Sequence, residues 1–203
     1  MGKGYSSLII YLTIEYSQVS NLSNASSLIF NSLLAFPKYF GNADNRAVNW
    51  CGEANDFLTP PRRLILNPVL GFYIDSTLFP SPRLQVSNRL ADDSDRLLLG
   101  PFCGKPACQF IQTAPGKAKG VCADAYVQAK TIVVPDVDLY PGHIACDGET
   151  KSEIVCPLIL DIEGGARTLG VLDLDCLAPN GFDQEDKVGL EKIANLIVKA
   201  CNW

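Results

Sequence analysis

Residues 140–153, YPGHIACDGETKSE, bring together several side chains that could take part in chemistry. The stretch holds the only histidine of the chain, His143, then Cys146 three residues later, and the acids Asp147, Glu149 and Glu153. The thiolate is the reactive form of cysteine, and a cationic neighbour lowers the pKa of a thiol. A protonated His143 would therefore favour a reactive Cys146, whereas the flanking acids would oppose it. The residues alone leave open whether this is a reactive pair or a polar surface loop with an ordinary hydrogen-bonded histidine.

The other cysteines make a redox-active pair with Cys146 possible. A redox pair needs a second cysteine with its Cα within about 4.4–6.8 Å of the first. Cys103, Cys108, Cys122 and Cys156 are candidates, and their spacing does not choose among them. Cys156 and Cys176 lie in runs of Val, Leu and Ile, which favours a purely structural role in the hydrophobic core. The spacings Cys103-x4-Cys108 and His143-x2-Cys146 are not those of a zinc site, so no metal is predicted.

Composition limits the classes of function. The chain has 203 residues with 47% hydrophobic and 19% charged residues, which is typical of an ordinary globular domain. The net charge is −5 and Lys and Arg form no long run, so we expect no nucleic-acid partner. Eight cysteines are too few for a disulfide scaffold, which favours a reducing, cytoplasmic location. The apolar stretch SSLIIYLTI falls short of the ~20 residues that cross a membrane, so no membrane partner is expected.

Hydrophobic periodicity predicts an α+β fold. Apolar residues at helical spacing predict a helix over residues 20–36, ended by Pro37, and a clearer one over 182–201, capped by Asp183. A third helix is expected over 121–129. Strand-like runs cover 71–75, 96–102, 108–112, 131–137, 153–162 and 168–176. Helices and mostly antiparallel strands in this order predict a single α+β sandwich.

The last two strands flank the Gly-rich turn EGGAR and predict a β-hairpin. In the second of them, GVLDLDC, apolar and acidic residues alternate. Val171, Asp173 and Asp175 fall on one face, and Leu172, Leu174 and Cys176 fall on the other. The leucines predict a core face, and the aspartates predict a wet or ligand-facing one.

At this point several motifs carry a resemblance. The stretches NLSNASSLIF, VNW…GFY, LGPFCGKPACQ, KGVC, VPDVDLYPGHIACDGETKSEIVCPL and LGVLDLDC occur in order over residues 20–50 and 71–201. Together they resemble the free methionine-(R)-sulfoxide reductases, which are single GAF-domain proteins. The resemblance implies a central antiparallel sheet of about six strands, with helices packed on one face and the ligand pocket on the other. It also implies a reductase of free methionine sulfoxide that needs no cofactor and is reset by thioredoxin. A homodimer is compatible with it.

The resemblance also assigns roles to residues. Cys146 matches the nucleophile, Cys108 matches the cysteine that forms a disulfide with it, and Cys122 matches a third cysteine of debated role. Glu153, Asp173 and Asp175 match ligand-binding carboxylates. Trp50 and Tyr73 match aromatic walls around the methyl end of the substrate. Which of Cys108 and Cys122 resolves the sulfenic acid stays open.

Two segments depart from the family pattern. Residues 1–19 are an atypical N-terminal segment, so the GAF domain is expected over 20–203. Residues 52–70 form an insertion between two motifs that are nearly contiguous in the family, and residues 76–95 read as a further long loop. Removal of 52–70 restores VNWCGFY, so we consider an in-frame unspliced intron alongside a genuine loop.

Two other functions compete with the reductase. A non-catalytic GAF sensor would bind a small ligand in the same pocket without needing three placed cysteines. An inactive product of a reading frame with a retained intron would neither bind nor turn over the substrate.

Overall fold

The structure is a computed structural model that describes residues 18–34, 69–78, 95–103, 107–146 and 148–203. Trp50, the predicted N-terminal segment up to residue 17, and most of the two long stretches at 52–70 and 76–95 lie outside the described residues. The described elements position every predicted site residue other than Trp50.

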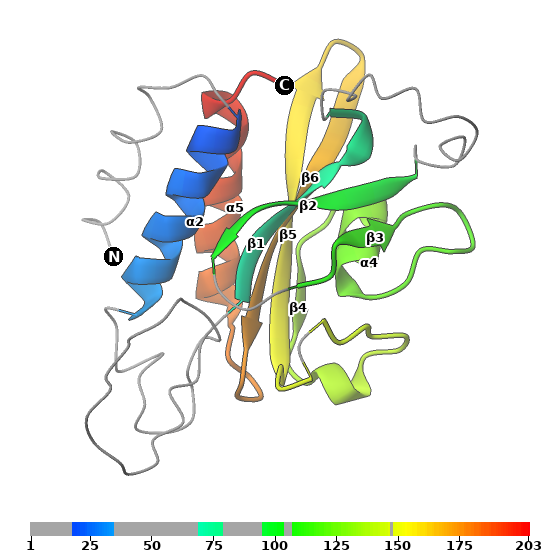
Figure 1. Cartoon of the computed structure of the whole chain (residues 1–203), viewed down its shortest axis with the longest axis vertical. Helices are drawn as coiled ribbons and strands as arrows, with labels where there is room; N and C mark the ends of the chain where they lie inside the picture. The colour runs from blue at the N-terminus through cyan, green and yellow to red at the C-terminus, as the bar shows by residue number, and fades with distance from the viewer. Residues whose placement is uncertain (1–17, 35–68, 79–94, 104–106, 147) are drawn as a thin grey trace.

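A six-stranded antiparallel sheet forms the centre of the fold (Figure 1). The strands are β1 (Val69–Asp75), β2 (Arg96–Cys103), β3 (Phe110–Gln112), β4 (Ile132–Val134), β5 (Ser152–Ile162) and β6 (Gly165–Cys176). Their order across the sheet is β3-β2-β1-β6-β5-β4. Strands β5 and β6 form the predicted hairpin, with Ile162 paired to Gly165 next to the turn. The expected sheet of about six strands is confirmed.

Two helices cover one face of the sheet. Helices α2 (Gln18–Leu34) and α5 (Gln184–Ala200) lie side by side against it (Figure 1). The predicted cap of α5 is present, because the Asp183 side chain accepts hydrogen bonds from the backbone N–H groups of Glu185 and Asp186. These two helices are the expected helical layer.

A third helix lies on the opposite face. Helix α4 (Val121–Gln128) packs its buried residues against side chains of β1, β5 and β6 that point away from α2 and α5. Two short 3-10 turns, η1 (Ser76–Leu78) and η2 (Val137–Leu139), complete the described elements. The expectation that all helices pack on one face therefore holds for α2 and α5, whereas α4 helps to build the pocket face.

The alternation in β6 separates core from site as predicted. Leu172, Leu174 and Cys176 are buried in the cluster that also contains residues of α2 and α5. Full burial of one such leucine stabilises the fold by about 1.5–3 kcal/mol. Asp173 and Asp175 occupy the opposite face and line a cavity. The apolar side of β6 thus holds the strand in place while its acidic side faces the cavity.

Strand β1 begins inside the predicted insertion. Val69 and Leu70, the last two residues of 52–70, pair with Asp175 and Leu174 of β6. Leu70 is fully buried in the core next to the helices. The C-terminal edge of the insertion is therefore part of the central sheet.

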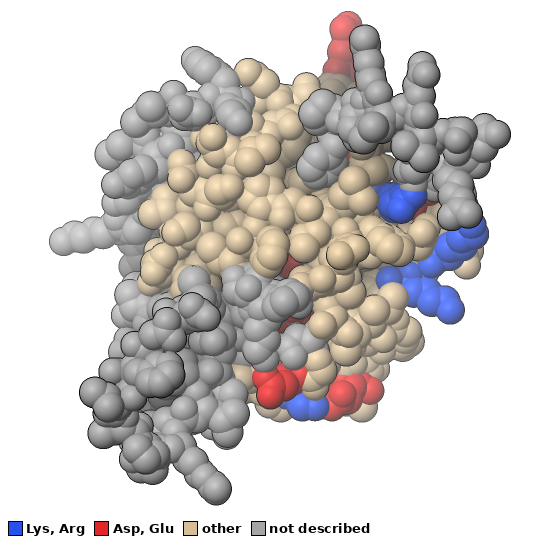
Figure 2. Space-filling model, in the orientation of Figure 1, with Lys and Arg blue, Asp and Glu red and all other residues tan. Residues whose placement is uncertain are grey.

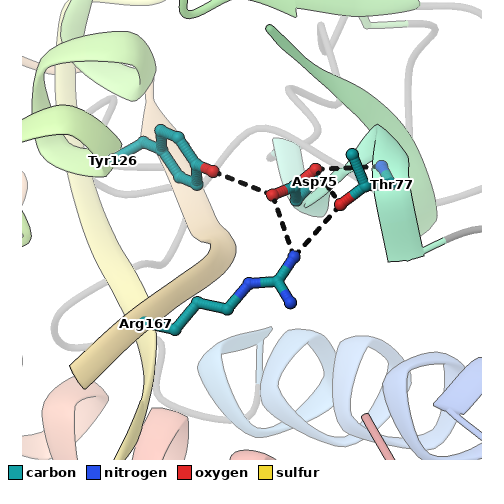
Figure 3. A network of polar contacts seen from close by, with 4 residues as sticks. All are labelled: Asp75, Thr77, Tyr126 and Arg167. Carbon is teal, nitrogen blue, oxygen red and sulfur yellow. Dashed lines mark hydrogen bonds and ion pairs between the residues drawn. The ribbon is translucent and has the colours of Figure 1, made fainter. Parts of the chain in front are cut away.

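A polar network fastens the end of β1 to α4 and β6 (Figure 3). The Asp75 carboxyl accepts hydrogen bonds from the Thr77 backbone N–H at 2.9 Å, the Thr77 hydroxyl at 2.8 Å and the Tyr126 hydroxyl at 3.0 Å. Arg167 of β6 reaches both Asp75 and Thr77, at 3.5 and 3.1 Å. Tyr126 lies on α4, so this network fixes the helix against the sheet.

Figure 2 shows mostly uncharged side chains on the face in view, with basic side chains in small groups at its right margin and at its lower edge beside acidic ones. Within the described ranges, no helix combines the length and the apolar character needed to cross a bilayer.

Candidate functional site

A cavity of about 200 Å³ lies between α4, β3, the chain around residues 143–146, and strands β5 and β6. Six of the predicted site residues line it: Cys108, Cys122, Cys146, Glu153, Asp173 and Asp175. They come from segments far apart in the sequence, and the antiparallel sheet brings them to one face. The cavity is therefore a concave site with convergent polar groups, as ligand sites usually are.

Cys108 and Cys146 form a disulfide on the cavity wall. Their Cα atoms are 5.3 Å apart, within the range of ordinary disulfides, although 38 positions separate them in the sequence. Cys108 is half-buried just before β3, and Cys146 is exposed at the end of the stretch that holds the only histidine. The pairing is the one that the family resemblance implies.

Cys122 stays free at the bottom of the cavity. It lies in the first turn of α4 and is buried, with its Sγ 3.8 Å from Oε1 of Glu153. Burial, and then the nearby Asp173 and Glu153, raise the pKa of this thiol well above its usual value. Cys122 is therefore held as a neutral thiol.

Glu153, the second residue of β5, is a buried acid with one basic neighbour. Its Oε2 lies 3.3 Å from Nε2 of His143. Burial raises the pKa of Glu153 to about 7, with a further raising effect from Asp175 and an opposing one from His143. Burial is thus a larger cause of the raised pKa than the acidic neighbours are.

Asp173 and Asp175 complete the acidic side of the cavity. Asp175 pairs directly with Glu153 across the β5–β6 ladder, and Asp173 pairs with Val155. Burial and the nearby Glu153 raise the pKa of Asp173 well above its usual value. Oδ1 of Asp173 is buried and has no hydrogen-bond partner within the described part of the chain. An acceptor left unpaired in this way favours a ligand that donates to it.

Of the two aromatic residues predicted to enclose the substrate, Tyr73 and Trp50, the structure describes only Tyr73. Tyr73 is 1% exposed, packs in the same apolar cluster as Cys122, and leaves its hydroxyl without a partner among the described residues. Nearby Asp173 and Cys122 help burial to raise the pKa of this phenol. Tyr73 therefore lies behind the acids rather than on the cavity surface. Trp50 lies outside the described residues.

Sequence reasoning missed the contacts that hold the loop of Cys146. The Tyr140 hydroxyl donates to Oδ2 of Asp124 on α4 at 2.7 Å, and the Tyr140 carbonyl accepts from the His143 N–H at 3.1 Å. Ile144 lies over Gly120, where an added Cβ would approach it to 3.5 Å. No spacing in the sequence points to these pairs, because they depend on how the loop folds back onto α4.

Three comparisons with known proteins show which family the chain resembles. Residues 83–201 match the model of the GAF domain. The free methionine-R-sulfoxide reductase of Saccharomyces cerevisiae is 42% identical over 187 residues, which are 92% of this chain and 77% of the yeast protein. A solved structure of a GAF domain has 39% identity and a TM-score of 0.68, over 99% of this chain and 89% of that one.

A further solved structure is that of a bacterial reductase. The free methionine-R-sulfoxide reductase of Neisseria meningitidis, in complex with its substrate, has 28% identity and a TM-score of 0.65, over 96% of this chain and 84% of that one. The fold, the placed cysteines and these similarities lead to one conclusion. The chain belongs to the GAF-domain family and, within it, to the free methionine-R-sulfoxide reductases.

Proposed function

We propose that this protein reduces free methionine-R-sulfoxide to methionine by thiol chemistry at Cys146. The observation that carries the proposal is the Cys108–Cys146 disulfide on the wall of a cavity that also contains Glu153 and Asp173. Such a disulfide is the product expected when a sulfenic acid condenses with a second thiol. A ligand sensor would have no need for it.

The first step transfers the sulfoxide oxygen to Cys146. The Cys146 thiolate attacks the sulfoxide, the oxygen ends on the cysteine as a sulfenic acid, and the thioether of methionine leaves. Two electrons pass from the cysteine sulfur to the methionine sulfur. The sulfoxide oxygen needs a proton as its bond to sulfur breaks, and Glu153, with a pKa of about 7, supports the role of that acid.

The second step forms the disulfide. Cys146 sulfenic acid reacts with the Cys108 thiol, and the oxygen leaves as water. The pairing seen in the structure supports Cys108 as the resolving cysteine. The burial of Cys122 and its raised pKa support a different role for that thiol, in shaping the acidic floor.

The third step needs an external dithiol, for which we propose thioredoxin. Thiol–disulfide exchange regenerates both thiols and leaves the reductant as a disulfide. Cys146 is the more exposed half of the bond, which supports attack from outside at that side of the cavity. A reducing, cytoplasmic location would keep such a reductant available.

The acids also suit a free amino acid. Its ammonium group would meet Asp173, whose Oδ1 has no partner in the described part of the chain, and Asp175, which also lines the cavity. A peptide-bound methionine sulfoxide has no such ammonium group. We therefore propose that the free amino acid is the substrate and that the residue within a protein is not.

The test uses the full chain with a thiol reductant and racemic free methionine sulfoxide. We expect loss of the R epimer alone, and no reduction of a methionine sulfoxide in the middle of a peptide. The Cys201→Ser variant is the control and should keep the activity. Cys201 is a buried free thiol in the apolar cluster that contains residues of α2 and α5, not at the cavity. Binding without turnover would favour the sensor, and neither binding nor turnover would favour an inactive product of a mis-assembled reading frame.

A further inference from the structure

Three potential metal ligands meet at the bottom of the cavity. One ligand atom each from Cys122, Glu153 and Asp173 lies within 4.8 Å of the other two, and all three residues are buried. We call these three residues the acid–thiol cluster. They line the cavity, so a small solute can reach them from solvent.

The spacing suits a tetrahedral ion. When a sulfur ligand at about 2.3 Å and an oxygen ligand at about 2.0 Å bind one Zn²⁺ tetrahedrally, the two atoms lie about 3.5 Å apart. In the structure, Sγ of Cys122 and Oε1 of Glu153 are 3.8 Å apart. A shift of a few tenths of an ångström would bring the pair into coordination geometry.

Two further observations favour a cation at the cluster. Oδ1 of Asp173 is buried without a hydrogen-bond partner in the part of the chain that the structure describes, and Asp173 is 7% exposed. His143 lies at Oε2 of Glu153, so that Oε1 is left on the side of Cys122. Carboxylates that bind a metal ion are usually held by hydrogen bonds to neighbouring groups, and His143 can provide one here.

We propose that the acid–thiol cluster binds one thiophilic divalent cation, Zn²⁺ or Cd²⁺, and that the bound ion blocks the cavity. The thiolate of Cys122 and the two carboxylates provide three negative charges against the two positive charges of the ion. Binding displaces the thiol proton of Cys122 and any proton held by the two acids, and these protons go to solvent. A fourth position stays open for water, as in sites with three protein ligands.

The thiolate decides which ions bind. Soft sulfur ligands favour zinc and cadmium, whereas Mg²⁺ and Ca²⁺ prefer sites made of oxygen alone. Neither Cys108 nor Cys146 belongs to the cluster, so the disulfide-bonded protein should bind the ion. Metal binding does not depend on the proposed function, but competition with methionine sulfoxide does.

The test titrates the oxidised full-length protein with Cd²⁺ and follows the ultraviolet charge-transfer absorption of a cadmium–thiolate bond. We expect this absorption to saturate at one Cd²⁺ per chain, with protons released to the buffer. Cys122→Ser should abolish it, and Asp173→Asn should weaken binding at least tenfold. Cys201→Ser should leave it unchanged, because that buried thiol lies in the core beside α5. Circular dichroism checks that each variant folds.

Several outcomes would overturn the proposal. No charge-transfer absorption in the wild-type protein would exclude a thiolate ligand, whatever the variants do. Absorption that survives in Cys122→Ser would place the ion on another cysteine. In a separate arm, free methionine sulfoxide should displace the Cd²⁺. Bound Cd²⁺ that the sulfoxide does not displace would overturn the blocking of the cavity, while lack of turnover in metal-free buffer would bear on the proposed function alone.

Discussion

His143 lies against Glu153, with Nε2 of the imidazole 3.3 Å from Oε2 of the carboxyl group. The lone histidine of the chain therefore contacts the buried acid of the cavity. His143 is three positions before Cys146 in the sequence, but the side chain that it contacts is that of Glu153 in strand β5. This places His143 in the role of orienting the acid, with the other oxygen of Glu153 directed to Cys122.

The pKa of Glu153 predicts how the activity depends on pH. The titratable groups around it include His143, Cys122, Asp173, Asp175, Tyr73 and Tyr140, and burial is the main cause that raises its pKa to about 7. An acid with a raised pKa keeps its proton at low pH and loses it as the pH rises. We therefore expect loss of the Glu153 proton to lower the rate constant of sulfoxide reduction as the pH rises through about 7, against the opposing gain in Cys146 thiolate. Glu153→Gln should lower it by about 100-fold or more.

The measurement is the rate of sulfoxide reduction under single-turnover conditions against pH, with a chelator present. Single turnover removes the pH dependence of the external reductant. A rate in Glu153→Gln close to that of the wild-type protein would remove Glu153 from the role of acid.

The hydrogen bonds around Asp75 should contribute to the unfolding free energy of the protein by holding the end of β1 against α4 and β6 (Figure 3). Tyr126→Phe removes the hydroxyl that donates to Asp75 at 3.0 Å and should cost about 1–2 kcal/mol of unfolding free energy. Lys151→Met breaks an exposed ion pair with Asp138 and should change stability by less than about 1 kcal/mol. Urea denaturation measures both changes. Equal stability of the two variants would mean that the network does not anchor α4.

The contact between β1 and β6 predicts a strict need for glycine at position 170. A Cβ added there would lie 2.1 Å from the backbone oxygen of Tyr73 and 2.8 Å from Cα of Ile74. Backbone atoms cannot move aside as a flexible side chain can, so Gly170→Ala should destabilise the protein by at least about 2 kcal/mol. Gly165→Ala, with nothing within 4 Å of its added Cβ, is the matched control and should be nearly neutral. A thermal melt of Gly170→Ala that matches Gly165→Ala would contradict this packing.

The register of β1 allows a prediction about the insertion at 52–70. If these residues are absent, Cys51 joins Gly71, so Cys51 takes the place of Leu70 and Trp50 the place of Val69. Position 69 pairs with Asp175, which lines the cavity, and directly paired residues share a face of the sheet. We therefore expect a chain without 52–70 to fold, to place Trp50 on the cavity face, and to bind methionine sulfoxide with a lower KM.

Two measurements decide this question. Transcript sequencing should find messages that lack these codons, and uniform retention of the codons would refute the intron. Steady-state kinetics of the shortened protein should show the lower KM, and a shortened protein that does not fold would show that the segment belongs to the domain.

Much of the fold could be predicted because its patterns are local. Helical spacing before Pro37 and after Asp183 predicted α2 and α5 within a few residues of their observed bounds. The alternation in LGVLDLDC predicted which side of β6 is core. Strand β4 is shorter than predicted, because residues after Val134 turn into η2, where the Asp136 side chain accepts from the N–H of Asp138.

The site was harder to predict because its contacts are not local. The spacing of the cysteines left four candidates for a redox pair, and only the family resemblance selected Cys108 and Cys146. The pairs His143–Glu153 and Tyr140–Asp124 arise where a loop folds back onto β5 and α4, which no periodicity shows. The burial of Tyr73 likewise depends on one apolar cluster that residues of α4, β1, β5 and β6 build together.

The most direct test of the proposed chemistry is one turnover without a reductant. Fully reduced protein is mixed with free methionine-R-sulfoxide, and the methionine released and the disulfide formed are quantified by mass spectrometry of peptides. We predict one methionine per chain together with the Cys108–Cys146 disulfide, none from Cys146→Ser, and a trapped sulfenic acid at residue 146 in Cys108→Ser. Methionine released by Cys146→Ser at the wild-type rate would contradict the assignment of Cys146 as the nucleophile.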